Sequence, residues 1–348
     1  MPLWNDFDEL IIDDTLSLDA VGWQGSRLSV KFGDGFGAEA RNGAESGLLR
    51  WTASDGGVWT DDTDYNDLVA GVPTFQYYEQ FIRDHINGDS SIFWLEYRGK
   101  KYHAAFVNPG YDAERLTSDL FSVSGLEIEQ RRVQGVAYND DGSIYEPWAW
   151  LSGRSVVGVS DNTAFTPWPD VGGVHDFSLA SLSGGTGPKL QTNEVNSLPI
   201  VEFTTDGASC AVTSLTVRNI WLVCKVREAT FGSDRVLISD DATTNVLAGE
   251  AGTTKFEDGG YGAGFTYKLN GTSYVSSNQQ APMNAYGVVH MRWEYGFNFL
   301  AEVNLGCGTG GGAEQAPIDV AEFIIDNAEI TSTQADRVSR MLKDVYGL

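Results

Sequence analysis

The sequence predicts a mainly β protein with two domains, the second of which ends in one helix. Its 348 residues include 40 glycines, and short apolar runs alternate with clusters of turn residues, a pattern typical of β-sheet proteins. A chain of this length is more natural as two domains than as one. The hydrophobic content of 42% is sufficient for a core in each domain.

The first domain, residues 1–136, is predicted to be β-rich with one helix. Residues 27–32 alternate apolar and polar side chains, as expected for a half-buried strand. Within residues 72–89 the apolar spacing changes to three and four, which predicts a helix. Two strand-like runs within residues 91–107 are separated by Arg-Gly-Lys and predict a hairpin, and residues 119–133 supply a last long strand.

A linker is predicted at residues 137–147, which are polar and rich in turn residues. Residues 148–348 then contain short strands separated by turn clusters at fairly regular intervals, which predicts an antiparallel β-sandwich of the jelly-roll type. The strands expected there are 199–205, 219–228, 235–240, 264–269, 288–295, 299–305 and 320–326.

The end of the chain predicts a helix that closes the sandwich. Thr331 is placed to cap it, and Gln334 three residues later completes a capping box. Such a helix is built to lie on a sheet, because its apolar residues form one stripe. The stripe consists of Ala335, Val338, Met341, Leu342 and Val345.

Charge and cysteine content exclude several classes of function. The formal net charge of −25 comes from both halves of the chain and would repel a nucleic-acid backbone, so DNA-binding roles are not expected. The acidity has two interpretations: solubility, or a surface over which DNA passes without sticking. Three cysteines without paired spacing predict no disulfide framework. We expect no secretory signal and no membrane span, and therefore synthesis in a reducing cytoplasm.

Four sequence blocks of the first domain occur in a characteristic order. They are RLSVKFGDGF at 27–36, the helix YYEQFIRDH, the run with Phe93-Trp94-Leu95, and Phe121 to Gln130. Together they resemble the phage lambda minor tail protein M family over residues 20–133. The resemblance implies a homohexameric ring at the distal end of a siphophage tail, a virion protein made in the host cytoplasm. The ring-assembly residues carried over are Phe32, Gly33, Asp34, Gly35 and Phe36.

That resemblance also implies partners. A ring subunit of this kind contacts copies of itself, the tail tube protein, and the tail hub with other tail-tip proteins. Genome DNA would pass through the channel without specific binding, in agreement with the acidic composition.

Three blocks of the second domain resemble the concanavalin A-like, laminin-G-like lectin/glucanase sandwich. The resemblance covers residues 145–348 and implies a sandwich directed outward, which would contact host-surface glycans or neighbouring tail subunits. The positions that carry it are Trp168, Pro169, Asp170, Asn193, Asn196, Leu198, Pro199, Phe203, Tyr346, Gly347 and Leu348.

Cofactor motifs in the chain are incomplete. GDGFGA at 33–38 fits a dinucleotide fingerprint, but no βαβ unit follows it. DDTDYND at 61–67 offers oxygen ligands but lacks the glycine and glutamate that an EF-hand loop requires, so an irregular calcium site and a solvated acidic loop both stay open. The four histidines have no zinc-site spacing. We expect no metal site and no cofactor, with calcium as the one exception left open.

The sandwich is expected to bind and not to catalyse. Residues 140–348 contain neither the E-x-D-x-x-E of retaining glucanases nor a G-x-S-x-G elbow, so no catalytic residue and no enzyme activity are predicted. Sugar binding needs aromatic faces for stacking. The candidates are Trp148, Trp150, Tyr261, Tyr267 and Tyr274, with core packing as the alternative for each; for Trp168 a structural role is favoured.

Taken together, the sequence predicts a structural virion protein of a siphophage tail tip, a distal tail ring subunit with an outward lectin-like domain. The alternative is an adhesin that binds or degrades glycans, in which the sandwich is the active part. A third possibility is a sandwich that binds neighbouring tail subunits and no sugar.

Overall fold

The computed structural model of the chain forms two compact units, Pro2–Tyr145 and Glu146–Leu348. In the first unit it describes residues 9–11, 18–20, 50–53, 57–60, 92–97, 100–108, 112–115, 120–124, 127–131, 133, 136–139 and 142–145. In the second unit it describes all residues except 182–186, 205, 233–234, 241–243, 258–263, 276–277 and 307–316.

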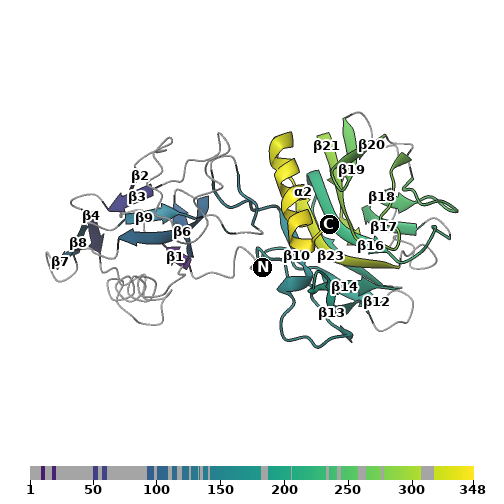
Figure 1. Ribbon diagram of the computed structural model, residues 1–348, viewed down its shortest axis with the longest axis horizontal. Coiled ribbons are helices and arrows are strands. Elements are labelled where there is room, and N and C mark those ends of the chain that lie inside the picture. Colours follow the sequence, from purple (N-terminus) through teal and green to yellow (C-terminus); the bar gives the residue numbers. More distant parts are fainter. Residues whose placement is uncertain are drawn as a thin grey trace. The chain divides into compact units, whose positions relative to one another are not determined.

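The described part of the first unit contains two β-sheets (Figure 1). The larger sheet has the strand order β1-β5-β6-β9-β3-β2 and the smaller has the order β4-β8-β7. Strands β5 and β6 pair in antiparallel fashion, from Phe93 opposite Ala104 to Tyr97 opposite Lys100, which confirms the predicted hairpin. The bounds are β1 (Glu9–Ile11), β2 (Leu18–Ala20), β3 (Arg50–Ala53), β4 (Gly57–Thr60), β5 (Phe93–Tyr97), β6 (Lys100–Asn108), β7 (Asp112–Arg115), β8 (Leu120–Ser124) and β9 (Glu127–Gln130).

Several predictions for the first unit lie outside the described residues. These are the strand at 27–32, the five proposed ring-assembly residues Phe32 to Phe36, the acidic stretch 61–67 and the helix at 72–89. They stay predictions.

The segment before the second unit folds back onto the first unit. Tyr138 and Ile144 form an antiparallel bridge, and the backbone N–H of Ile144 donates to the carbonyl of Lys101 in β6 at 2.7 Å. The hydroxyl of Tyr138 lies 2.8 Å from Nδ1 of the buried His103 and accepts a hydrogen bond from the backbone N–H of Val133. Ile144 itself is buried. Most of the stretch predicted as a linker is therefore held against β6.

The second unit is an antiparallel β-sandwich with a closing helix, as predicted (Figure 1). Its larger sheet has nine strands, in the order β11-β13-β14-β23-β16-β21-β19-β20 with β10 also paired to β23. These are β10 (Ala149–Ser152), β11 (Thr163–Ala164), β13 (Lys189–Val195), β14 (Leu198–Phe203), β16 (Leu215–Val226), β19 (Phe265–Leu269), β20 (Thr272–Tyr274), β21 (Gly287–Phe299) and β23 (Ile318–Asp326).

The smaller sheet of the sandwich has five described strands in the order β12-β15-β22-β17-β18. They are β12 (Ser178–Ser181), β15 (Asp206–Ala211), β17 (Arg235–Asp240), β18 (Thr244–Gly249) and β22 (Glu302–Leu305). Every one of the seven strands predicted from the sequence coincides with an observed strand.

The core lies between the two sheets, and one row of residues shows how the smaller sheet contributes to it. Five apolar residues stand directly opposite one another across its strands and belong to the buried core. Because successive side chains of a strand point to opposite faces, the residues next to this row face away from the core. The row consists of Leu179, Ala208, Leu305, Ile238 and Leu247.

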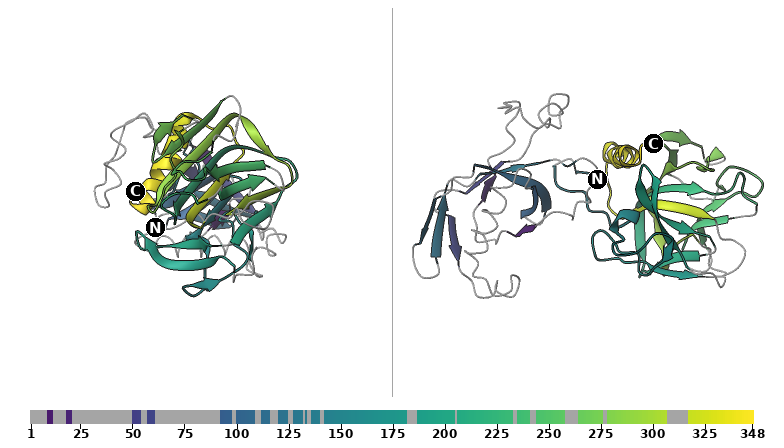
Figure 2. Two further views of the ribbon diagram at one scale, coloured as in Figure 1. Left: turned by 90° about the vertical axis from the view of Figure 1, so that its right-hand side faces the viewer. Right: turned by 60° about the horizontal axis from the view of Figure 1, so that its bottom comes forward.

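Helix α2 (Ser332–Tyr346) closes the sandwich on the other side, as its amphipathic pattern predicts. Thr331 Oγ1 accepts the backbone N–H of Gln334 at 3.1 Å, and Gly347 ends the helix with a φ of 67°. The helix lies on the face of the nine-stranded sheet that points away from the core, where Trp221 Nε1 donates to Ser339 Oγ at 3.0 Å (Figure 2). The predicted apolar stripe is buried. In the part of the chain that is described, no helix has the length and apolarity needed to span a bilayer.

Candidate functional site

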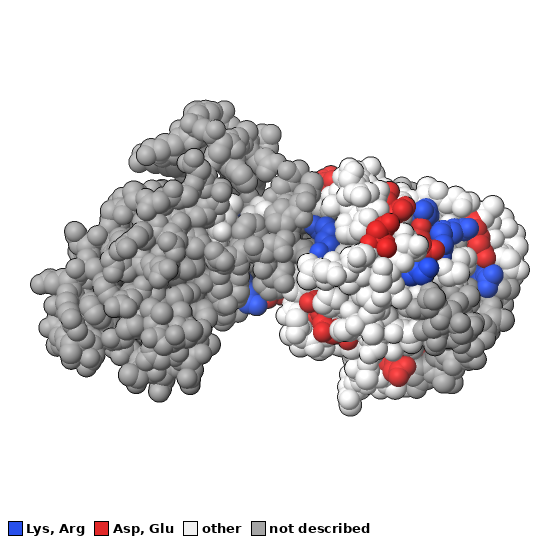
Figure 3. Space-filling view, turned by 90° about the horizontal axis from the view of Figure 1, so that it is seen from below, with Lys and Arg blue, Asp and Glu red and all other residues white. Residues whose placement is uncertain are grey.

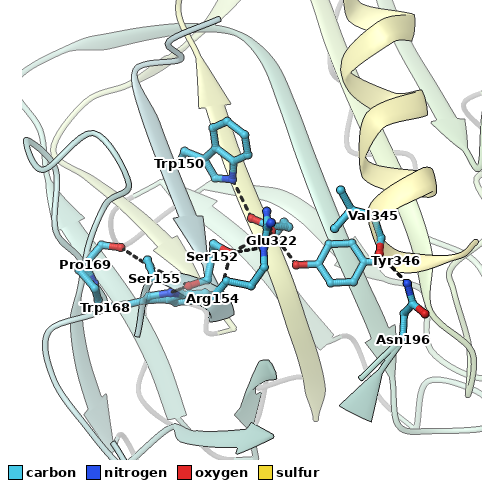
Figure 4. Close-up of polar contacts among 10 residues, drawn as sticks. All are labelled: Trp150, Ser152, Arg154, Ser155, Trp168, Pro169, Asn196, Glu322, Val345 and Tyr346. Atoms are coloured by element: carbon cyan, nitrogen blue, oxygen red, sulfur yellow. Dashed lines mark hydrogen bonds and ion pairs between the residues drawn. The ribbon is translucent and has the colours of Figure 1, made fainter. Parts of the chain in front are cut away.

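Four polar and aromatic side chains converge on the buried carboxylate of Glu322, in the middle of β23 (Figure 4). One carboxylate oxygen accepts from Trp150 Nε1 at 2.7 Å. The other accepts from Ser152 Oγ at 2.9 Å, Arg154 Nη2 at 2.8 Å and the hydroxyl of Tyr346 at 2.6 Å. Trp150 and Ser152 come from β10, Arg154 from the 3-10 turn η3 (Gly153–Ser155), and Tyr346 from the last turn of α2. The cluster thus joins three elements to β23.

The chemistry of this cluster is structural. A tyrosine beside a carboxylate is a plausible nucleophile pair only if the hydroxyl is activated and reachable. Burial, and then the charge of Glu322, instead raise the pKa of Tyr346 well above its ordinary value, and Glu322 is 0% exposed. Burial opposes the charged form of Arg154, but the charges and hydrogen bonds of Glu322 and Tyr346 together outweigh it and raise the pKa of Arg154. The cluster is a closed ion pair that fastens the end of the helix.

Two of the predicted sugar-stacking residues are corrected by this geometry. Trp150 is 1% exposed and its indole is engaged with Glu322, so it offers no ring face to a ligand. Tyr267 is equally buried, and its hydroxyl donates to the carbonyl of Gln280 at 2.6 Å. Trp168, for which a structural role was favoured, is fully buried and donates to the carbonyl of Ser152.

The remaining predicted aromatic residues are not gathered into one site among the described residues. Trp148 is half-buried and stacks on His175 with ring centroids 4.0 Å apart. Tyr274 is half-buried and stands opposite Tyr267 in the β19–β20 pair. Tyr261 lies outside the described residues. Trp148 and Tyr274 therefore stay individual predictions.

A different polar feature lies on the smaller sheet, and the sequence did not reveal it. Ser178 stands opposite Ser209, and Ser209 stands opposite Asn304. Asn304 in turn pairs with Ser239, and Ser239 with Asn245. These five residues, one from each strand, form the polar row. Ser178, Ser209, Asn304 and Ser239 are each next to a residue of the apolar core row, so these four face away from the core. At Asn245 a register shift between β17 and β18 interrupts the alternation.

Exposure varies along the polar row. Its two ends, Ser178 and Asn245, are exposed and Ser209 is half-buried. In the centre, Asn304 is only 6% exposed and Ser239 is fully buried. The amide nitrogen and oxygen of Asn304 are not among the buried side-chain atoms of the described residues that lack a hydrogen-bond partner, whereas both amide atoms of Gln279 are.

The described residues contain no group of three or more histidine, cysteine, aspartate or glutamate side chains arranged to hold a metal ion. The acidic stretch for which calcium was left open falls outside them. On the face seen in Figure 3, acidic and basic side chains of the second unit lie near one another, and uncharged surface surrounds them.

Comparison with known proteins gives a limited result. No family model matches the chain, and no curated protein matches it. Among solved structures, Trypanosoma rangeli sialidase in complex with 2,3-difluorosialic acid is 13% identical with a TM-score of 0.38, and Trypanosoma rangeli sialidase alone is 11% identical with a TM-score of 0.34. In both cases the match covers 74% of this chain and 45% of the other, so the chain spans less than half the length of these sialidases. At such low scores the likeness carries no argument about chemistry.

One expectation from the sequence is nevertheless corrected by this comparison. The absence of glucanase and elbow motifs predicted that the chain is not an enzyme. The similar structures are enzymes by their own descriptions, including a mutant sialidase with trans-sialidase activity (TM-score 0.36, 11% identity), and they contradict that prediction. We no longer class the chain as non-enzymatic, and the experiments below measure turnover beside binding.

Proposed function

We propose that the second unit is a lectin-like module that binds glycans on the outer face of its five-stranded sheet. The single observation that carries the proposal is the polar row, which is exposed at Ser178 and Asn245 and half-buried at Ser209. Sugar hydroxyls both donate and accept hydrogen bonds, and serine and asparagine side chains do the same. Neighbouring strands are about 4.8 Å apart, so five of them span roughly 19 Å, the scale of several sugar units.

The location of the module is a further part of the proposal. The resemblance of residues 20–133 to a tail protein family supports a siphophage tail tip, where the first unit would join six copies into a ring against the tail tube and hub. Electron microscopy of the purified protein and of whole tails tests this. Six-fold rings at the tail tip are expected, and a stable monomer absent from virions would overturn it.

The glycan proposal is tested with the full chain on a glycan array, followed by titration of the best ligand. Asn304→Ala is compared with Asn298→Ala, a matched change at an exposed position on β21 of the other sheet. We expect binding to be lost or strongly reduced only in the first variant. A release assay for reducing sugars on the same ligands shows whether binding is accompanied by turnover. Absence of binding to every glycan would reject the proposal.

A further inference from the structure

We infer that the first half of helix α2, residues 332–339, is released from the nine-stranded sheet when His290 takes up a proton. This device lies on the opposite sheet from the polar row and does not depend on the proposed function. Three features support it: the position of His290 beneath the helix, the hydrogen bonding of its ring, and the unequal attachment of the two ends of α2.

His290 is enclosed between the sheet and the helix. It is 3% exposed, and both of its sequence neighbours belong to the sandwich core, so His290 itself faces the side that α2 covers. Its ring stacks on the indole of Trp221, the residue opposite it on β16, with centroids 4.6 Å and planes 1° apart. The same indole donates to Ser339 Oγ of α2 at 3.0 Å. The ring therefore reaches water when this part of the helix moves away.

The enclosed ring has no acceptor for a second proton. Nε2 lies 3.4 Å from the side-chain oxygen of Asn219, which can only accept, so Nε2 carries the hydrogen of the neutral ring. Among the described residues, Nδ1 of His290 is buried without a hydrogen-bond partner. Protonation would place an unsatisfied N–H at Nδ1 and remove a positive charge from water. The closed helix therefore requires a neutral ring.

The charges around His290 do not compensate for this burial. The charged groups that face it are Lys268 on β19, Arg292 on β21 and Asp336 on α2. The one carboxylate, Asp336, is already paired with Lys268, whose Nζ lies 2.6 Å from it. From β16 the uncharged Asn219 faces the ring, and the buried Asp326 of β23 stands one strand further away, opposite Asn219. Burial, and then the charge of Lys268, lower the pKa of His290 to about 3.

The two ends of α2 are attached unequally. The last turn is fixed by the hydroxyl of Tyr346, which lies 2.6 Å from the buried carboxylate of Glu322. Besides its apolar residues, the first half is held by the bond from Trp221 to Ser339 and by the partly exposed ion pair of Asp336. Partly exposed ion pairs contribute little to stability. We therefore expect the first half to move while the last turn stays in place.

Acid favours the open helix because the open state binds a proton that the closed state does not. In water the His290 ring has an ordinary pKa of about 6.5. The stability of the closed helix that is present above pH 6.5 is lost as the pH falls towards the lowered pKa of about 3. The equilibrium constant for opening should rise about 100-fold between pH 8 and pH 4.5.

Hydrogen exchange of the full chain, followed by mass spectrometry and corrected for the intrinsic rate at each pH, tests this inference. We expect the protection of residues 333–340 to fall about 100-fold between pH 8 and pH 4.5, while that of β14 changes far less. In His290→Gln, whose side chain stays uncharged, the fall should be much smaller. Equal falls in the two chains would overturn the inference. Joint loss of protection in α2 and β14 would also overturn it, since the whole unit would then be unfolding.

A control and a second measurement complete the test. His175→Gln makes the same change at a half-buried histidine that stacks on Trp148, and it should respond to pH as the unmodified chain does. If His290→Gln does not fold, NMR titration of the unmodified chain decides. Protonation of the His290 ring must then coincide with the loss of protection in α2. A ring that titrates near pH 6.5 while α2 stays protected would overturn the inference.

Discussion

The two outer faces of the sandwich differ in the burial and the hydrogen-bond partners of their polar side chains. On the nine-stranded sheet, Glu322 is buried with four donors from three other elements, and α2 covers much of this face. On the five-stranded sheet, the polar row is exposed at Ser178 and Asn245, and Asn304 is not among the buried groups that lack a partner. A buried group with its partners stabilises the fold, whereas a group in contact with water contributes little to it. The comparison separates side chains that hold the fold together from side chains that can meet a ligand.

The largest expected effect is on the closed face. Glu322→Ala leaves the guanidinium of Arg154 buried without its carboxylate, and breaking a buried ion pair in this way costs about 3–5 kcal/mol. Thermal unfolding followed by calorimetry should show a large fall in the transition of the second unit. Glu302→Ala, an exposed carboxylate on the other sheet, is the control and should change the midpoint little. Equal effects of the two changes would contradict the structural role of Glu322.

Acid should weaken the same closed face through His290. Burial lowers the pKa of His290 to about 3, and its ring stacks on Trp221 with centroids 4.6 Å apart beneath α2. Unfolding returns the ring to an ordinary pKa of about 6.5. Between these values the unfolded chain binds more protons, so stability present above pH 6.5 is lost as the pH falls towards 3.

The measurement is the unfolding midpoint from pH 7 to 4, for the unmodified chain and for His290→Gln. The difference between the two should shrink as the pH falls, because the carboxylates that titrate in this range are common to both chains. A constant difference would show that His290 does not contribute to the acid sensitivity.

Removing one donor from the Glu322 cluster should have an intermediate effect. Tyr346→Phe keeps the ring and deletes only the hydroxyl that lies 2.6 Å from the carboxylate. Hydrogen bonds to charged groups contribute about 1.5–3 kcal/mol, so the free energy of unfolding should fall by that order in chemical denaturation. A fall as large as that of Glu322→Ala would mean that ring packing was lost as well.

The open face should show the reverse pattern of stability and binding. Because the Asn304 amide is not part of a buried hydrogen-bond network, Asn304→Ala should leave the unfolding midpoint nearly unchanged while glycan affinity falls. Gln279→Met is a contrasting change, since the amide of Gln279 is fully buried without a partner and belongs to no polar row. It should stabilise the protein without affecting binding. A strong loss of stability in Asn304→Ala would place Asn304 with the structural residues.

The smallest effect is expected at the helix surface. Lys268 Nζ lies 2.6 Å from a carboxylate oxygen of Asp336, and both side chains are partly exposed. Such pairs contribute about 0.2–1 kcal/mol, so Lys268→Ala should lower the unfolding midpoint only slightly, and less at high salt. A shift comparable to that of Tyr346→Phe would show that Lys268 anchors the helix.

Much of the fold was predictable from the sequence, because the signals concerned are local. The cap at Thr331 and the apolar stripe of α2 occupy adjacent turns, and the strand around Trp221 is a long apolar run. The strands that were missed include β12, β15 and β18, built largely from serine, alanine and glycine. Such residues give weak strand signals.

The candidate site was harder to predict for the same reason. Ser178, Ser209 and Asn245 lie on the three missed strands. The sequence alone does not show that strand pairing aligns them with Asn304. The sequence pattern instead predicted aromatic residues such as Trp150 as the site. The burial of Trp150 depends on tertiary contacts with Glu322, 172 positions away. A row that crosses strands is a property of pairing, and a single sequence does not display it.

The bridge between Tyr138 and Ile144 at the end of the first unit has a practical consequence for separating the two units. A cut at the predicted boundary near residue 136 would remove Ile144, and its hydrogen bond to Lys101, from β6. The isolated sandwich would then carry apolar residues at its N-terminus that are buried in the intact chain. A cut between Tyr145 and Glu146 keeps each part with its own contacts. Anyone who wishes to graft the sandwich onto another carrier should therefore start at Glu146.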